Sequence, residues 1–266
     1  VGNIADSFRF TNRVKEQIWL NNRYLNGVNV TLISPRRYGK SSLVRFTANK
    51  ILKEEKDYIF CFIDLFNIKS EQEFYTQYLE AFVNAIKGKW ESKVKEVFGY
   101  FKYLIPSFTY QASDDTKLAV KLDWETSKKS ADEILDVPEK YAQAKGKKII
   151  YCLDEFQNIG FFDEPVAFQK KLRSHWQLHK NVSYCMYGSK RHMMVEFFNS
   201  SSMPFYRFGE IMFLDKIHES DWLPFITSQF ERTKKSISTE EAALIAQNAE
   251  NHPFYVQQLA LNVWFN

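Results

Sequence analysis

The stretch that decides the fold is VNVTLISPRRYGKSSLVRFTANKIL, residues 28–52. It opens with an apolar, β-rich run, continues through a polar loop that ends in Gly39-Lys40-Ser41, and then takes on the apolar spacing of a helix. Glycine lets a backbone wrap closely around an anion, lysine supplies a mobile positive charge, and the start of a helix presents free N–H groups. The segment therefore predicts a strand, a phosphate-binding loop and a helix in succession.

The loop supplies the first candidate nucleotide-binding residues. They are Pro35, Arg36, Arg37, Tyr38, Gly39, Lys40, Ser41 and Ser42. In the pattern GxxxxGK[ST], the lysine reaches the β and γ phosphates and the hydroxyl binds Mg²⁺, which are the roles expected here for Lys40 and Ser41. Ser34 stands where this pattern has its first glycine, so the loop departs from the pattern at that position.

An acidic pair ends another apolar run. KKIIYCL, residues 147–153, leads directly into Asp154 and Glu155. Ligands of open α/β sheets bind at the carboxyl ends of the strands. We therefore expect Asp154 to hold the Mg²⁺ shell through Ser41, and Glu155 to act as general base on the attacking water. The alternative is a strand that simply ends in solvated carboxylates.

Further β-rich runs alternate with helical segments, which is the pattern of a parallel sheet with crossover helices. The expected strands are 28–33, 58–65, 148–153, 182–187 and 211–214, and the expected helices are 41–53, 71–86 and 130–144. Two alternating runs around Asp114 and Asp115 predict a β-hairpin insertion at about 107–127. From Ser238 onward the pattern is wholly helical. We interpret 1–220 as a P-loop ATPase domain and 221–266 as a small α-helical lid.

Two more candidate site residues lie downstream. Ser189 follows the fourth expected strand and, with that strand between the first and third, would face the γ-phosphate and the lytic water; an ordinary turn is the alternative. Arg207 precedes the fifth expected strand and would neutralise charge that develops on the γ-phosphate. Its alternative is a surface arginine paired with Glu210 or Asp215.

Four motifs together carry a resemblance to a known family. They are PRRYGKSSL (35–43), DEFQ (154–157), FYR (205–207) and HPFYVQ (252–257). With them the chain resembles the STAND-like AAA+ ATPases of archaeal and Bacteroidetes type. The resemblance implies an ASCE-type P-loop NTPase whose parallel sheet has the order 5-1-4-3-2 and is followed by a helical lid. It also implies ATP or ADP and Mg²⁺ as ligands.

The same resemblance adds residues on the adenine side of the nucleotide. Arg13 looks like part of the box that contacts adenine, and His252 with Pro253 is similar to the lid element that packs near the base. A structural salt bridge is the alternative for Arg13, and the first position of a helix is a sufficient role for Pro253. Gln157, which completes DEFQ, either orients water or caps the following segment.

Composition limits the remaining classes of protein. With 266 residues, 45% of them hydrophobic, the chain is too apolar for general disorder. Its three cysteines lie in apolar runs without a CxxC motif, which favours a reducing, cytoplasmic setting. No apolar run approaches the ~18 residues that span a bilayer, so no membrane role is expected. Lys and Arg exceed Asp and Glu by 36 − 32 = 4, which does not support nucleic-acid binding.

The expected function is a slow, Mg²⁺-dependent ATPase used as a nucleotide switch, with a protein partner or self-association. A non-hydrolysing scaffold that keeps its nucleotide and a DNA-associated ATPase loader or motor are the alternatives. The sequence begins with Val1 and stops within the apolar segment 257–266, so we expect a processed, trimmed or truncated chain that lacks a segment after Asn266.

Overall fold

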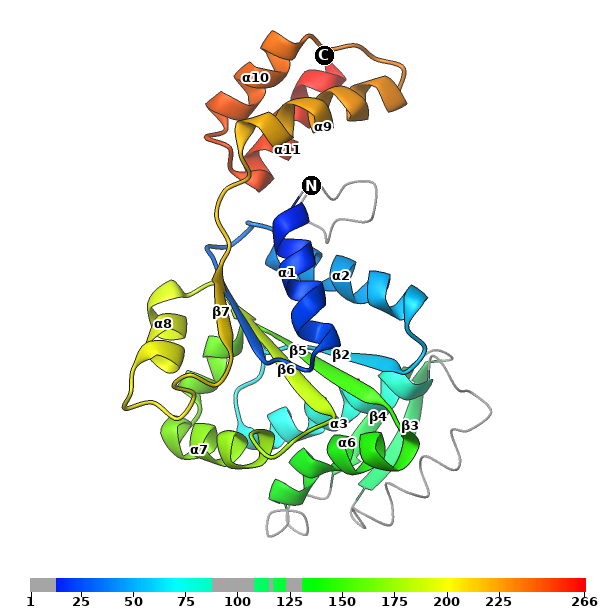
Figure 1. The fold of residues 1–266 in the computed structure, drawn as a ribbon, viewed down its shortest axis with the longest axis vertical. Coiled ribbons are helices and arrows are strands. Elements are labelled where there is room, and N and C mark those ends of the chain that lie inside the picture. Colours follow the sequence, from blue (N-terminus) through cyan, green and yellow to red (C-terminus); the bar gives the residue numbers. More distant parts are fainter. Residues whose placement is uncertain (1–12, 88–107, 115–116, 123–130) are drawn as a thin grey trace.

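The computed structural model describes residues 13–87, 108–114, 117–122 and 131–266, and its centre is a parallel sheet (Figure 1). The sheet has the order β2-β5-β6-β1-β7. Its strands are β1 (Val30–Ile33), β2 (Tyr58–Asp64), β5 (Lys148–Asp154), β6 (Val182–Gly188) and β7 (Glu210–Phe213). Counted along the chain without the separate hairpin, this is the order 5-1-4-3-2, so the predicted topology is confirmed.

The register brings the carboxyl ends of the strands to one edge of the sheet. Ile33 at the end of β1 pairs with Gly188 of β6 and with Phe213 of β7. Asp64 at the end of β2 pairs with Asp154 at the end of β5. The loops that follow β1, β2, β5 and β6 therefore begin along a common edge, where open α/β sheets bind their ligands.

Helices cover both faces of the sheet, as Figure 1 shows. The helices of this part of the chain are α1 (Val14–Leu25), α2 (Lys40–Glu54), α3 (Glu71–Lys87), α6 (Ala131–Lys145), α7 (Pro165–Trp176), α8 (Arg191–Asn199) and the 3₁₀ helix η2 (Phe156–Phe161). Along β5, Tyr151 packs into the core under α3, α6 and α7, whereas Cys152 packs into the core under α1 and α2. Burial on both faces explains why these strands are continuous apolar runs. The sequence analysis did not predict α1.

The predicted β-hairpin consists of β3 (Phe108–Asp114) and β4 (Lys117–Leu122), which pair antiparallel and form a separate sheet. The register shifts between Ala112 and Asp114. The remaining residues of the predicted insertion, 107, 115–116 and 123–127, lie outside the described residues. β4 lies beside α3, so the hairpin is attached at the side of the sheet opposite α2.

The helices α9 (Glu219–Arg232), α10 (Thr239–Asn248) and α11 (Pro253–Phe265) form a second unit above the sheet (Figure 1). They share their own core, which includes Trp222, Ile245 and Val256. The helix-start signals in the sequence are in place, because Ser238 and Glu241 form a reciprocal capping box and Pro253 opens α11. α9 begins at Glu219, so the predicted division at 220/221 falls within its first turn.

A polar cluster ties α6 to α7 and to β6. Asp136 Oδ1 lies 2.9 Å from His175 Nδ1 and 3.0 Å from His179 Nε2, and His179 Nδ1 lies 2.7 Å from the Tyr184 hydroxyl. Burial alone raises the pKa of Asp136, but the hydrogen bonds and charges of His179 and His175 together outweigh it and lower the pKa. The ionised carboxylate is therefore the form that this cluster stabilises.

Replacing Asp136 with asparagine should lower the free energy of unfolding by about 1–2 kcal/mol, because both imidazoles lose a charged acceptor. A carboxylate whose pKa is lowered on folding contributes stability above its unfolded pKa and loses it as the pH falls through the folded value. The difference between wild type and Asp136→Asn in urea denaturation should therefore shrink below about pH 4. Asp163→Asn, at an exposed position, is the control. A difference in unfolding free energy between wild type and Asp136→Asn that stays constant in acid would contradict this prediction.

Candidate functional site

The loop between β1 and α2 is built on two residues with left-handed backbone. Arg37 has φ +66° and Gly39, which caps α2, has φ +89°. A Cβ on Gly39 would meet nothing within 4 Å, so the backbone conformation, and not crowding, favours glycine here. This turn directs the N-terminus of α2 into the space that the loop encloses, which is the arrangement that binds anions.

Lys40 is curled into the loop. Its Nζ donates to the carbonyls of Ser34 and Pro35 at 2.9 and 3.0 Å and to Ser34 Oγ at 3.2 Å. Only 6% of the residue is exposed, and burial lowers its pKa to about 8. Ser34, which replaces the first glycine of the pattern, is 2% exposed and supplies an acceptor that glycine would lack. The departure from the pattern therefore has a local role in holding the lysine.

The loop contacts the acidic pair directly. Ser41 Oγ donates to Asp154 Oδ2 at 2.6 Å. Burial raises the pKa of Asp154 to about 6, and the neighbouring carboxylates of Glu155 and Asp64 act in the same direction. The hydroxyl of Ser41 and the backbone N–H of Glu155 oppose this shift by donating to the carboxylate. Asp154 is thus a desolvated carboxylate in contact with the loop.

Glu155 is held by two donors. Ser189 Oγ donates to Glu155 Oε2 at 2.8 Å, and Gln157 Nε2 donates to the same oxygen. The Glu155 backbone has φ +50°, a left-handed conformation that is strained for a residue with a side chain. Ser189 therefore lies beside Glu155 and contacts its carboxylate directly, while its expected role toward the γ-phosphate and the lytic water stays a prediction.

A cavity of about 370 Å³ joins these groups. It is lined by Arg36, Arg37, Gly39, Lys40, Ser41, Ser42, Asp64, Phe66, Asp154, Glu155, Pro253, Phe254 and Gln257. Most of the predicted loop residues and both acidic residues thus face one space, together with the start of α11 from the second unit. Pro35 and Tyr38 belong to the loop but do not line the cavity.

Four lining residues were missed by the sequence analysis. Asp64 ends β2 in register with Asp154, so the rule that selected Asp154 applied to it as well. Phe66 follows it, with the guanidinium of Arg36 5.7 Å from its ring centre. Phe254 and Gln257 lie inside the motif HPFYVQ, but nothing in the sequence indicated which side of α11 faces the loop.

The second unit touches the loop through aromatic contacts. The guanidinium of Arg37 lies 4.1 Å from the ring centre of Phe254, and the ring of Tyr38 meets His252 edge-on at 4.9 Å. Arg37 and His252 therefore link the phosphate-binding loop to the start of α11. Burial is the main cause that lowers the pKa of His252, which favours the neutral imidazole.

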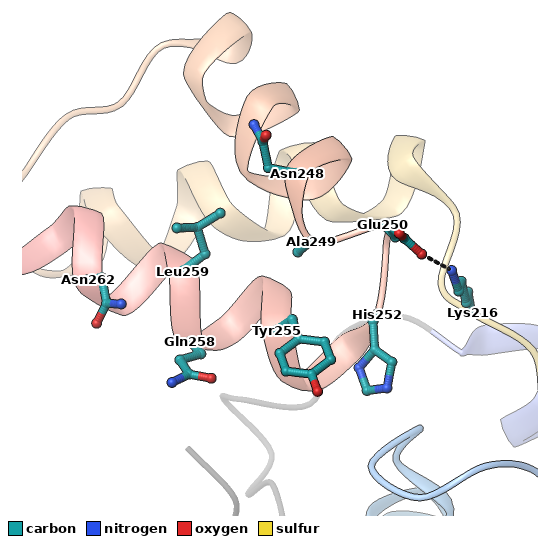
Figure 2. Close-up of a pocket in the computed structure, with 9 residues that line it drawn as sticks. All are labelled: Lys216, Asn248, Ala249, Glu250, His252, Tyr255, Gln258, Leu259 and Asn262. Atoms are coloured by element: carbon teal, nitrogen blue, oxygen red, sulfur yellow. Dashed lines mark hydrogen bonds and ion pairs between the residues drawn. The ribbon is translucent and has the colours of Figure 1, made fainter.

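A second cavity, of about 410 Å³, lies on the other side of His252 (Figure 2). It is lined by Lys216, Asn248, Ala249, Glu250, His252, Tyr255, Gln258, Leu259 and Asn262. In Figure 2 the rings of His252 and Tyr255 lie next to each other, with centres 4.7 Å apart. Lys216 and Glu250 form an ion pair of 3.2 Å at its rim. The cavity thus combines aromatic faces with amide and charged groups.

Arg13 lies in neither cavity. Its buried guanidinium donates to the carbonyls of Tyr38 and Asp215 at 3.1 and 2.6 Å, and to Glu16 at 3.0 Å. The salt bridge considered as its alternative role is therefore present. Arg13 joins α1, the phosphate-binding loop and the segment that leads to the second unit.

Arg207 lies at the opposite edge of the sheet. It precedes β7, whose first residue Glu210 pairs with Val30 at the start of β1, whereas the loop follows the end of β1. Arg207 is exposed and its guanidinium lies 5.1 Å from the ring centre of Tyr206. Arg207 lies on the surface, as its alternative role required, but within the described residues it forms no ion pair with Asp215 or with Glu210, which accepts from Arg23 at 2.8 Å. The structure does not bring Arg207 together with Lys40 and Glu155 in the same chain.

The described residues contain no group of three or more His, Cys, Asp or Glu side chains arranged to hold a metal ion by themselves. His175 and His179, the one histidine pair at helical spacing, contact Asp136. No helix in the described part of the chain combines the length and apolarity needed to cross a membrane.

Comparison with known proteins gives a family match and several structural likenesses. Residues 38–159 match the family described as the KAP family P-loop domain. Comparison with curated proteins finds no match. Among solved structures, the Walker-type ATPase of Pyrococcus abyssi has 16% identity and a TM-score of 0.63, covering 93% of this chain and 66% of that one.

Two proteins of Aeropyrum pernix are similar as well. The ORC2 protein in its ADP form has 14% identity and a TM-score of 0.58, over 98% of this chain and 64% of that one. The ORC1 protein in complex with DNA has 10% identity and a TM-score of 0.53, over 96% and 66%. This chain spans about two thirds of the length of each of the three structures. The sheet order, the loop ahead of α2 and these likenesses together show that the chain has the fold of a P-loop NTPase.

Proposed function

We propose that the chain is a Mg²⁺-dependent module that binds and hydrolyses ATP and works as a slow nucleotide switch of the AAA+ or STAND-like type. The observation that carries the proposal is the convergence of Lys40, the Ser41–Asp154 pair and Glu155 on one cavity. A cation, a metal-binding pair and a carboxylate base are the parts that phosphoryl transfer to water requires. A scaffold that only retains a nucleotide needs no catalytic base such as Glu155, which argues against that alternative.

Ser41 and Asp154 fit a bound Mg²⁺. Hydroxyl and carboxylate oxygens suit this ion, which is commonly held by one or two carboxylates together with substrate phosphates and water. Asp154 is desolvated, with a pKa raised to about 6, and a nearby divalent cation would stabilise its charged form. When bound, the ion would neutralise charge on the β and γ phosphates.

The remaining chemistry belongs to the chain's own side chains. Lys40 would exchange the carbonyls of Ser34 and Pro35 for phosphate oxygens, an exchange favoured because burial destabilises its charge without an anion. Glu155 would accept a proton as water attacks the γ phosphorus and the bond to the bridging oxygen breaks, releasing ADP and phosphate. The Aeropyrum pernix ORC2 protein has been solved in an ADP form and in ADPNP–ADP complexes, which supports nucleotides of this type.

The nucleotide base would occupy the cavity shown in Figure 2, next to the phosphate cavity. His252 lines this second cavity and Pro253 lines the first, so a nucleotide that extends from Lys40 toward α11 passes from one to the other. Aromatic rings and amides are the groups that stack on a base and bond to its edge. The predicted adenine-side role of His252 agrees with this placement, whereas Pro253 lines the phosphate cavity and Arg13 would support the site from outside.

Replacing Tyr255 with alanine should weaken ADP binding about tenfold, since stacking of a base on an aromatic ring contributes about 1–3 kcal/mol. Calorimetric affinity for inorganic pyrophosphate should stay unchanged in the same variant, because that ligand has no base. Phe265→Ala, which removes an exposed ring at the other end of α11, is the matched control. Equal losses for ADP and pyrophosphate would contradict this placement of the base.

The contacts between the phosphate-binding loop and α11 would couple nucleotide binding to the position of the helical lid. Arg37 lines the phosphate cavity and also stacks on Phe254. A phosphate that attracts the guanidinium would compete with this contact, so binding and hydrolysis would change how α11 rests on the loop. The switch function is thereby tied to a specific pair of residues.

A second copy of the chain or another protein is the proposed partner. Arg207 lies at the far edge of the sheet from Lys40, so it would serve the γ-phosphate of a neighbouring subunit. This arrangement requires self-association, which sedimentation with and without Mg·ATP tests. A DNA-associated role rests on a likeness of fold to the ORC proteins alone, and stimulation of turnover by duplex DNA would support it.

The first experiment is to denature the purified protein and identify any released nucleotide by chromatography. Stoichiometric ADP would indicate a closed switch limited by exchange. Steady-state phosphate release then separates the hydrolysing switch from the scaffold. Protein that is empty and also fails to bind Mg·ATP by calorimetry would contradict the proposal.

A further inference from the structure

The proposed catalytic base has one oxygen fixed by the protein. Both Ser189 Oγ and Gln157 Nε2 donate to Oε2 of Glu155. No described residue donates a hydrogen bond to its Oε1. Because Glu155 lines the phosphate cavity, Oε1 is the oxygen available to a water molecule there.

Gln157 is an unusual donor for a folded core. It is 1% exposed, and among the described residues its Oε1 has no hydrogen-bond partner. A buried polar atom without a partner destabilises a fold, and an aliphatic side chain of similar size would avoid this penalty. The polar interaction that the amide makes is the bond to Glu155, whose backbone is itself left-handed and strained. Unpaired polarity and backbone strain at one place are typical of functional sites.

The end of β6 is shaped to admit this amide. A Cβ on Gly188 would lie 2.0 Å from Gln157 Oε1 and 2.8 Å from Met194 Sδ. The absence of a side chain at Gly188 therefore makes room for Gln157, while the next residue, Ser189, supplies the second donor to Glu155. Two elements, β6 and η2, thus act on one carboxylate oxygen.

We infer that Gln157 is a positioning residue, which together with Ser189 holds Oε2 of Glu155 so that Oε1 is presented to the attacking water. The inference rests on the ATPase function proposed above. It differs from both roles that the sequence left open for Gln157, because the amide contacts the base itself and makes no capping bond to η2.

The test compares Gln157→Leu with Gln169→Leu in the full chain. Gln169 lies on α7, is equally buried, and also has an Oε1 without a partner among the described residues, but it does not line the cavity. In Gln157→Leu, kcat for ATP should fall about 10- to 100-fold, the range typical of outer-shell residues that orient metal ligands, while KM and calorimetric ADP affinity stay within about twofold. Gln169→Leu should retain the wild-type kcat.

A second pair of variants tests the geometry without removing the amide. Gly188→Ala should lower kcat because its methyl group displaces Gln157. In a Gln157→Ala background the same change should lower kcat less, since the contact with the Gln157 amide is gone and only the contact with the flexible Met194 side chain remains. Melting temperatures measured on every variant separate loss of fold from loss of positioning.

The outcomes distinguish this inference from the function on which it rests. Wild type that releases no more phosphate than Glu155→Gln contradicts the ATPase proposal itself. Active wild type together with unchanged, or faster, turnover in Gln157→Leu overturns the positioning role and leaves the ATPase standing. Equal loss of kcat in Gln157→Leu and Gln169→Leu overturns it as well, because a general effect of core substitution would then explain both.

Discussion

Glu155→Gln is expected to reduce steady-state phosphate release by about 100-fold or more, while the affinity for ATP stays close to that of wild type. An amide cannot accept the proton of the attacking water, and loss of a general base typically lowers a rate by about 10²–10⁴-fold. Binding should persist because Lys40 and the Ser41–Asp154 pair, which contact the phosphate side of the cavity, are untouched. Coupled phosphate-release assays and calorimetry measure the two quantities separately.

The matched control for this prediction is Glu164→Gln, which makes the same chemical change at an exposed position before α7. It should leave turnover unaltered. Hydrolysis that continues at the wild-type rate in Glu155→Gln would remove Glu155 from its role.

The parts of the fold that follow from local pattern were predictable. The strands β1, β2, β5 and β6 are largely buried on both faces, so each appears in the sequence as an uninterrupted apolar run, and the loop before α2 has a recognisable glycine, lysine and serine. The capping box at Ser238 likewise marks a helix start by short-range hydrogen bonds alone. The order of the strands came from resemblance, because no local signal fixes which strand lies beside which.

The parts of the site that depend on distant contacts were not predictable. Arg13 was expected to contact the adenine of the nucleotide. Its guanidinium instead donates to two backbone carbonyls that are far from it in the sequence. Phe254 was not selected because its partner, Arg37, approaches from another unit of the chain. Gln157 was given a capping or water-orienting role, since the closeness of Gly188 to its amide is visible only in the folded protein.

Arg207 shows the limit of motif reasoning most clearly. Its place just before a strand suggested a role on phosphate, but the direction of a parallel strand puts the residue before it at the edge opposite the ligand. The motif and the geometry agree only if the phosphate belongs to another subunit. If Arg207 acts on the γ-phosphate, the protein must therefore self-associate.

Lys40→Ala should weaken binding of both ATP and inorganic pyrophosphate about 100-fold or more, because the cavity loses the charge that faces the phosphates. The fold should tolerate the change. Burial lowers the pKa of Lys40 to about 8, so its charge is destabilised inside the protein and is balanced by nearby carbonyls, which water can bond once the side chain is removed. Calorimetry with each ligand and a melting curve measure the two effects.

The control is Lys50→Ala, which removes the same charge from an exposed position later on α2, outside the cavity. This variant should bind both ligands like wild type. The contrast matters because a positive charge anywhere near the site attracts anions weakly, whereas Lys40 is enclosed with Ser34 and the start of α2. Wild-type affinity for both ligands in Lys40→Ala would contradict the assignment of this segment as a phosphate-binding loop. A loss for ATP without a loss for pyrophosphate would move the role of Lys40 from the phosphates to the rest of the nucleotide.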